Sequence, residues 1–322
     1  LILDALGESE KAYDAYYKAS WNQDVYAASM TRLSAIDAKR QDFERMEEHA
    51  KNALNYQAQN PVAGTLLSIA LERQGRRNEA KTTVSELLKK DPLNHFARFW
   101  ACCMGMMTRD AFYAGLKSDS SQTGLDIAIH FYDCGMKQEA ETLLEGIPEK
   151  SPMIYYFLGN DEKAEATPLT SSFAFRIEEY RLLKTIDLPM AHYYLGCLLY
   201  AGGRYQEAEQ EFLKTVQKKP EFYIPYRNLA ALYYSHLNRK DQVLPLLKKA
   251  LECHPEDEQL IFETVYVMGR LGVNPKERIA FLQSHPSERD DILIELARAY
   301  NQNGDYENTI SLFDSHNFVP CE

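Results

Sequence analysis

Small residues recur along the chain at two fixed distances. Gly203 precedes Ala208 by five residues, and Ala208 precedes Pro220 by twelve. The same spacings return twice upstream, in Gly75, Ala80 and Pro92 and in Gly135, Ala140 and Pro152. Two copies, 61–94 and 189–222, are each 34 residues long. Repetition at this period indicates an array of supersecondary units, each burying its apolar face only against its neighbours.

The first half of a unit predicts a helix and a turn. In 189–222, Tyr193, Gly196, Cys197 and Tyr200 stand at i, i+3, i+4 and i+7, which is one face of a helix. Gly203 follows as the residue that lets the chain turn with a positive φ. We therefore expect one amphipathic helix that ends in a tight turn.

The second half predicts another helix, antiparallel to the first. It begins acidic in "YQEAEQEFLKTVQ" and ends in a lysine pair, as the helix dipole favours, before Pro220 stops it. Gly196 and Ala208 lie where the two helices would cross, so that their backbones can approach closely. Phe212 would fill the gap to the next pair.

These residues resemble the tetratricopeptide repeat family. One unit supplies the signature positions Leu195, Gly196, Ala208, Phe212 and Pro220; the next supplies Leu229, Ala230, Tyr233, Leu247, Ala250 and Pro255; the last supplies Leu296, Ala297, Tyr300, Gly304 and Phe313. The unit at 257–286 departs from the pattern, since Glu263 and Thr264 replace Leu-Gly. The resemblance implies an all-α fold, a right-handed α-solenoid of antiparallel helix pairs.

A second, narrower resemblance concerns "SSFAFRIEEYRLLKTI", the following "AHYYLGCLLYAGGRYQEA" and the closing "HNFVPCE". These segments are similar to a helical-repeat region of large bacterial proteins that follows an amino-terminal β-rich domain like those of carbohydrate-active enzymes. Such chains often carry a Trp near the position where this one has Cys321.

No linker composition divides the chain, so we expect one solenoid over 1–322. The least regular stretch, 159–172, is where the array would separate into two lobes. Because "LILDALGESEKAYDAYYKAS" opens in the middle of a unit, we expect the sequence to be a fragment of a longer polypeptide. What lies upstream of Leu1 and downstream of Glu322 is left open.

Charge and composition exclude some partners. The net charge of −11 repels phosphate backbones, which argues against nucleic acid. No apolar run reaches the ~18 residues of a membrane span. The six cysteines form no Cys-x-x-Cys motif, and we interpret them as reduced core thiols. The compartment is open: the sequence favours the cytoplasm, but a targeting signal could have preceded Leu1.

Motifs for catalysis or cofactor binding are not found in the sequence. His130, Asp133 and Cys134 share a helical neighbourhood, but a solvated or half-buried helix face explains them better than a metal site. No Ser, Cys or His pairs with a base in sequence. We expect no metal, no cofactor and no enzymatic activity.

The groove of the array is the expected binding surface, since repeat arrays usually bind on their concave face. The family's groove positions fall on Tyr193, Tyr200, Arg227 and Tyr234, residue types that anchor interfaces. An alternative stays open, in which these tyrosines only pack between units. The Lys and Asn clamp with which some family members hold a carboxylate looks absent, because Ala231 replaces the Asn.

The sequence therefore favours a non-catalytic scaffold that binds a protein segment, or another domain of its own chain, in a concave groove. The alternative is an accessory region of a carbohydrate-processing polypeptide that docks the catalytic domain or holds a glycan. Tyrosine faces suit either a peptide or a sugar. The ligand and the oligomeric state are not determined.

Overall fold

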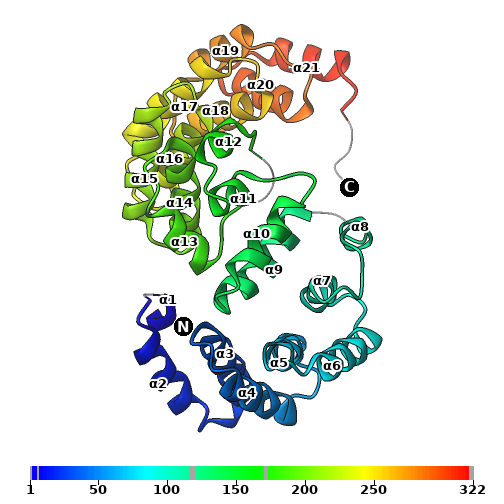
Figure 1. Ribbon diagram of the computed structural model, residues 1–322. Coiled ribbons are helices and arrows are strands. Elements are labelled where there is room, and N and C mark those ends of the chain that lie inside the picture. The colour runs from blue at the N-terminus through cyan, green and yellow to red at the C-terminus, as the bar shows by residue number, and fades with distance from the viewer. Residues whose placement is uncertain (1, 6, 117–119, 170–172, 319–322) are drawn as a thin grey trace. The chain divides into compact units, whose positions relative to one another are not determined.

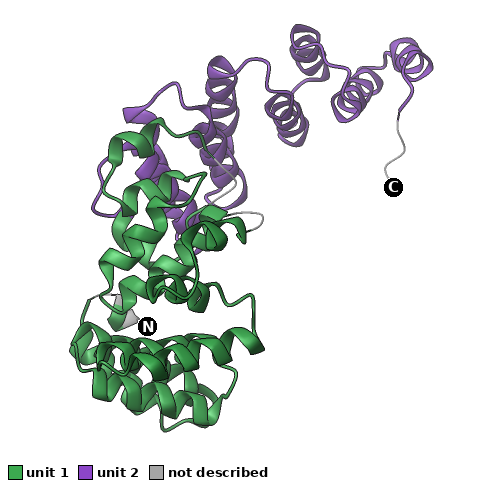
Figure 2. Cartoon of the chain, turned by 45° about the vertical axis from the view of Figure 1, so that its right-hand side comes forward, with its two compact units in different colours: residues 1–182 green, residues 183–322 purple. Residues whose placement is uncertain are grey.

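The structure is a computed structural model. It describes the whole chain except residues 1, 6, 117–119, 170–172 and 319–322 and the side chains of Ile2 and Ala5. The chain forms two compact units, residues 1–182 and 183–322 (Figure 2). No strand occurs in the described part of the chain, so the all-α fold predicted from the sequence is confirmed.

The first unit is a series of helices, most of which pack against the next helix along the chain (Figure 1). They are α1 (Ile2–Ala5), α2 (Ser9–Ala19), α3 (Tyr26–Lys39), α4 (Phe43–Tyr56), α5 (Pro61–Arg73), α6 (Arg77–Lys90), α7 (His95–Cys103), α8 (Arg109–Ala114), α9 (Ser120–Asp133), α10 (Lys137–Glu145), α11 (Pro152–Phe157) and α12 (Asp161–Ala166), with α13 (Ile177–Leu183) at the unit boundary.

The second unit begins with the regular copy of the repeat at 189–222. Its helices are α14 (Pro189–Ala201), α15 (Tyr205–Lys218), α16 (Tyr223–Ser235), α17 (Val243–Cys253), α18 (Glu258–Arg270), α19 (Pro275–Ser284), α20 (Asp290–Gln302) and α21 (Tyr306–Ser315). The expectation of a single array over 1–322, with a division at 159–172, stays a prediction. The unit boundary, between Leu182 and Leu183, falls ten residues after that stretch.

Helix starts and turns repeat with the sequence. The side chains of Asn60 and Asn94 accept hydrogen bonds from the amides of Ala63 and Ala97, and so cap α5 and α7. The turn between the helices of a pair contains a residue with positive φ, as predicted for Gly203 (+72°). In the repeat formed by α3 and α4, Gln41 occupies this turn position with a φ of +60°.

The helices of a pair cross at small residues, as the sequence predicts. A Cβ atom built on Gly196 would lie 2.6 Å from Cε1 of Phe212, so the aromatic ring packs directly on the glycine backbone. In two other repeats, α3–α4 and α5–α6, the equivalent small residue is a serine. The hydroxyls of Ser34 and Ser68 donate to the carbonyls of Met46 and Ala80, both at 2.9 Å, and thereby tie the two helices together.

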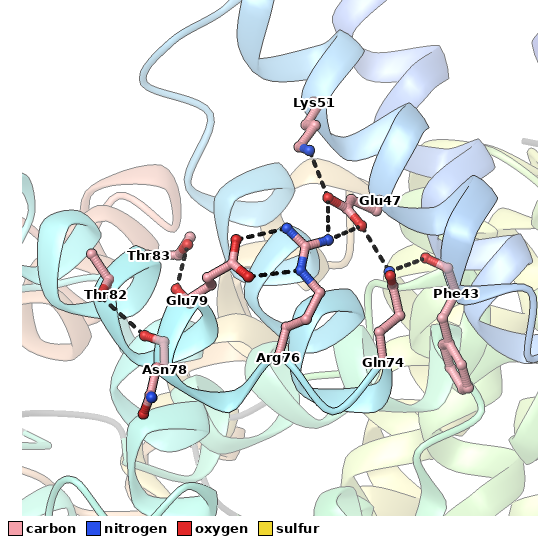
Figure 3. A network of polar contacts seen from close by, with 9 residues as sticks. All are labelled: Phe43, Glu47, Lys51, Gln74, Arg76, Asn78, Glu79, Thr82 and Thr83. Atoms are coloured by element: carbon pink, nitrogen blue, oxygen red, sulfur yellow. Dashed lines mark hydrogen bonds and ion pairs between the residues drawn. The ribbon is translucent and has the colours of Figure 1, made fainter.

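Adjacent pairs in the first unit are joined by a network centred on Glu47 (Figure 3). Its carboxylate accepts hydrogen bonds from Lys51, from Gln74 and from the guanidinium of Arg76, at 2.6–2.9 Å. Arg76 also donates two hydrogen bonds to Glu79. Burial alone would raise the pKa of Glu47, but the hydrogen bonds outweigh it and lower the pKa to about 2.

An equivalent pair occurs in the second unit, where Glu209 on α15 accepts hydrogen bonds from Arg239 and from the hydroxyl of Tyr233. Glu47 and Arg76 are 29 residues apart, and Glu209 and Arg239 are 30 apart because the later turn has one more residue. The carboxylate stands at the same repeat position in both cases, directly after Met46 on α4 and directly after Ala208 on α15. We therefore interpret this pair as a structural link between neighbouring repeats.

The first unit departs from nearest-neighbour packing at α9, which contacts α3 as well as α7. Nη1 of Arg32 on α3 lies 2.6 Å from Oδ2 of Asp133 on α9, and the same guanidinium pairs with Asp4. A Cβ atom on Gly135 would lie 3.4 Å from Cα of Lys39. The turn between α9 and α10 is thus brought against the end of α3.

Candidate functional site

A cavity of about 340 Å³ lies in the second unit between the first helices of two successive pairs, with the intervening helix α17 as its floor. Its volume is at the small end of the range of ligand sites, roughly 300–1,000 Å³. The side chains that matter most are Arg227, Ala231 and Tyr234 on α16, and Phe262, Glu263 and Tyr266 on α18. Val243 and Leu247 provide the apolar floor.

One side of this cavity, which we call the α16–α18 pocket, is closed by an ion pair. Arg227 donates from Nε to Oε2 of Glu263 at 2.6 Å, and its Nη2 pairs with the other carboxylate oxygen. The hydrogen bonds that Arg227 donates to Glu263 raise the pKa of Arg227, against the effect of burial. The pair holds the two helices at a fixed separation along the pocket.

Aromatic rings with cations over them form the rest of the wall. The ammonium of Lys240 lies 5.9 Å from the ring centroid of Tyr234, and the guanidinium of Arg270 lies 5.1 Å from that of Tyr266. Arg270 also donates to the Tyr266 hydroxyl at 2.8 and 3.0 Å. The pocket therefore combines an apolar interior with a basic rim, on a chain whose net charge is −11.

Of the four site residues predicted from the sequence, Arg227 and Tyr234 come together in the α16–α18 pocket. Tyr193 does not, because it is only 3% exposed. Its ring packs against Tyr194, Phe212 and Phe222, with centroids 5.1–6.2 Å away. Tyr193 is therefore a packing residue within and beside its own helix pair, as the alternative reading of the tyrosines anticipates.

Tyr200 belongs to a separate aromatic cluster. Its ring centroid is 5.7 Å from that of Tyr205 and 5.4 Å from that of His236, and its hydroxyl lies 3.2 Å from Nε2 of His236. His236 in turn stacks on Tyr205 at 3.9 Å. Tyr200 is half-buried and does not line the α16–α18 pocket.

The groove positions of the following unit, Ile261, Val265 and Met268, are buried in the core. Phe262 and Tyr266, each one residue after a groove position, line the pocket instead. The side of α18 that lines the pocket is therefore not the side on which the groove positions lie. The sequence contained one sign of this. Glu263, which breaks the repeat signature, is the residue that pairs with Arg227.

The sequence did not favour a metal site at His130, Asp133 and Cys134, and the contacts of the first two residues also argue against one. Asp133 pairs with Arg32, and His130 packs on Phe96 with centroids 4.9 Å apart. Burial lowers the pKa of His130. Within the described ranges, no three His, Cys, Asp or Glu side chains are placed to hold a metal ion.

The cysteines differ from the sequence interpretation in one respect. Those in the described part of the chain are free thiols, but only Cys134 is buried; Cys102, Cys197 and Cys253 are half-buried, and Cys103 is exposed. The apolar residues beside them in sequence do not cover all of these thiols. Cys102, Cys103 and Cys253 lie at the carboxyl-terminal ends of α7 and α17, next to turns. Cys321, part of the closing motif, lies outside the described residues.

Among the described residues, no helix has the length and apolar composition needed to cross a membrane. The same residues form successive antiparallel helix pairs that pack in chain order, which places the chain in the class of α-helical repeat proteins.

Within that class, residues 187–221, which contain the pair α14–α15, match the tetratricopeptide repeat family. The family predicted from the sequence is thereby confirmed for this unit. No curated protein matches the chain in sequence.

Several solved structures are similar at low identity. MamA from Desulfovibrio magneticus is 15% identical, and the match covers 62% of this chain and 94% of the MamA chain with a TM-score of 0.35. A tetratricopeptide repeat protein from Parabacteroides merdae is 14% identical over 95% of this chain and 92% of its own, with a TM-score of 0.30. Yeast Tom70 is 14% identical over 97% and 91%, with a TM-score of 0.26.

Proposed function

We propose that the chain is a non-catalytic protein-interaction scaffold and that the α16–α18 pocket receives a side chain of a partner protein. The observation that carries the proposal is the combination of an apolar floor and three aromatic walls in one cavity, with the cations of Lys240 and Arg270 over two of the rings. Tyrosine and arginine are the residues that most often dominate binding energy at interfaces. Tetratricopeptide repeats, the family of α14–α15, serve widely as binding modules.

The partner segment is expected to carry a large apolar side chain with acidic residues beside it. The apolar side chain would lie between Tyr234, Phe262 and Tyr266 over the floor of α17. The acidic residues would approach Lys240 and Arg270, which are exposed at the rim. Arg227 contributes less to such a contact than the sequence suggested, because Glu263 already neutralises it.

The binding experiment needs a partner obtained with the intact chain as bait, followed by affinity measurement with variants. Tyr234→Ala and Tyr266→Ala should each weaken binding by about 2 kcal/mol. Ala231→Trp is a sharper variant, since Ala231 is exposed at the pocket and a large side chain there would fill it without removing any contact. Lys248→Ala, an exposed position on α17 away from the pocket lining, is the control.

Each result bears on the proposal. If Ala231→Trp and Tyr234→Ala remain folded and bind the partner like the wild type, the pocket is not the binding site. If the pocket binds oligosaccharides in place of a peptide, and the same variants abolish that binding, the glycan-holding alternative replaces the scaffold. The resemblance to the helical region of carbohydrate-processing polypeptides stays a prediction until such a result.

A further inference from the structure

A second cavity, of about 520 Å³, lies in the first unit and goes beyond the proposed function. It is formed by three segments far apart in the chain: the turn from α3 to α4, the end of α5, and the turn from α9 to α10 (Figure 1). They meet because α9 packs back on α3, which is also the reason that Gly135 comes so close to Lys39. We call this space the three-turn cavity.

The charges around the three-turn cavity are mostly positive. Lys39, Arg73 and Lys137 line it, against a single carboxylate, that of Glu139. Glu139 is already engaged, since Nη2 of Arg73 lies 2.7 Å from its Oε1. Lys137 has only a longer contact, 3.4 Å, with Glu141. This excess of cations contrasts with the net charge of −11 of the whole chain.

The remaining lining is apolar or neutral. Ile69, Met136 and Cys134 provide a buried surface, and burial raises the pKa of the Cys134 thiol to about 12, so that it adds no negative charge. Helix α10 also begins at this cavity, and its N-cap residue Met136 has no side chain that can accept from the first amides. The field of the helix N-terminus therefore adds to that of the side chains.

We propose that the three-turn cavity binds a small organic anion, with its carboxylate or phosphate between Lys39 and Lys137 and its carbon portion over Ile69 and Met136. A cavity of this volume is suited to a molecule of metabolite size. Two ammonium groups on the lining of one cavity, neither with a strong protein partner, fit a doubly charged group better than a monovalent one.

The test uses defined probes on the intact chain, with binding measured by calorimetry or by chemical-shift changes. Glutarate offers two carboxylates on a short carbon chain, inorganic phosphate offers the other anion, and glutaramide is the uncharged match of glutarate. We expect glutarate or phosphate to bind and glutaramide not to bind. Affinity should fall as ionic strength rises, because these cations are at the surface.

Variants locate the site. Lys39→Gln with Lys137→Gln should weaken binding by about tenfold or more, since both charge partners are lost. The matched control is Lys89→Gln with Lys90→Gln, which removes the same charge from the exposed end of α6. Glu139→Gln should act in the opposite direction and tighten binding severalfold, because it removes the only carboxylate and releases Arg73.

The proposal is overturned if neither anion binds at concentrations up to about 20 mM. It is also overturned if the control pair weakens binding as much as Lys39→Gln with Lys137→Gln, because diffuse surface charge would then explain the affinity. Unfolding midpoints of all variants without ligand identify any change that acts through stability alone. Glu139→Gln guards against that case, since lost folding cannot increase affinity.

Discussion

Arg227 and Glu263 are 36 residues apart in the chain and form a two-bond ion pair that joins α16 to α18 along one side of a pocket. The pair connects the first helices of two successive repeats without using the helix between them. Such a contact is absent from the repeat signature, because Glu263 stands where the signature has Leu.

The Arg227–Glu263 pair should couple the two repeats energetically. Both side chains are partly exposed, so the coupling energy in a double-mutant cycle of Arg227→Ala and Glu263→Ala should be modest, about 0.5–1 kcal/mol. Urea unfolding of the four proteins measures it. A coupling energy of zero would mean that the pair only reflects side-chain proximity, and raising the salt concentration should reduce any coupling that is found.

Gly196→Leu should destabilise the protein by about 2 kcal/mol or more, because the new side chain must enter space occupied by the ring of Phe212. Thermal or urea unfolding gives the loss. Adding Phe212→Leu should recover part of it, since a smaller side chain opposite the glycine makes room. Unchanged stability in Gly196→Leu would show that the helices do not cross at this residue.

Gln41→Gly should stabilise the protein by about 1 kcal/mol. Gln41 has a φ of +60°, a conformation that is costly for a side chain with a Cβ atom and free for glycine. The opposite exchange, Gly75→Gln, tests the same position of the next unit, where φ is +79°, and should cost a similar amount. Shifts of the unfolding midpoint in the same direction for both variants would contradict this explanation.

The Glu47 network should make stability depend on acidity. The pKa of the Glu47 carboxyl is lowered from 4.5 to about 2 in the folded chain. A carboxyl with a lowered folded pKa stabilises the protein above its unfolded pKa, and this contribution disappears as the pH falls from about 4.5 through 2. At pH 7 Glu47→Gln should lower the free energy of unfolding by about 1 kcal/mol. The loss is no larger because the surrounding cations are solvated. Urea unfolding at pH 7, 4.5 and 3 should show a smaller acid loss in the variant; equal losses would disprove the assignment.

Limited proteolysis tests the organisation of the chain. We propose a single helical array in which early cleavage falls near 159–172, where the repeat pattern is least regular. Mass spectrometry of the first fragments identifies the sites. Early cuts at many turns between helix pairs would indicate independent units instead, because a cooperative array protects its internal junctions.

The repeat architecture could be predicted because its determinants are local and recur. Gly203, Gly196 and Ala208 act within one helix pair, through a left-handed turn and a close helix crossing, and their spacing is visible in sequence. The α16–α18 pocket was predicted only in part. Arg227 and Tyr234 lie on the side of α16 that the family's groove positions indicate, whereas Phe262 and Tyr266 depend on how α18 is turned toward α16.

The three-turn cavity could not be predicted for a different reason. It depends on a contact between α3 and α9, two helices that are not neighbours in the array. Nothing in the spacing of Lys39 and Lys137 indicates that they share a space. Tyr193 shows the converse problem: it stands at a groove position by register, yet the ring of Phe222, at the end of the same repeat, packs against it.

The pair Glu209–Arg239 keeps its geometry although the turn before Arg239 is one residue longer than its counterpart before Arg76. Alignment of successive units is therefore set by a side-chain contact after the turn, and extra residues are accommodated before it. This makes the exposed turn residue Asn238, beyond the contacts of His236, a natural place for an inserted epitope or fluorophore tag.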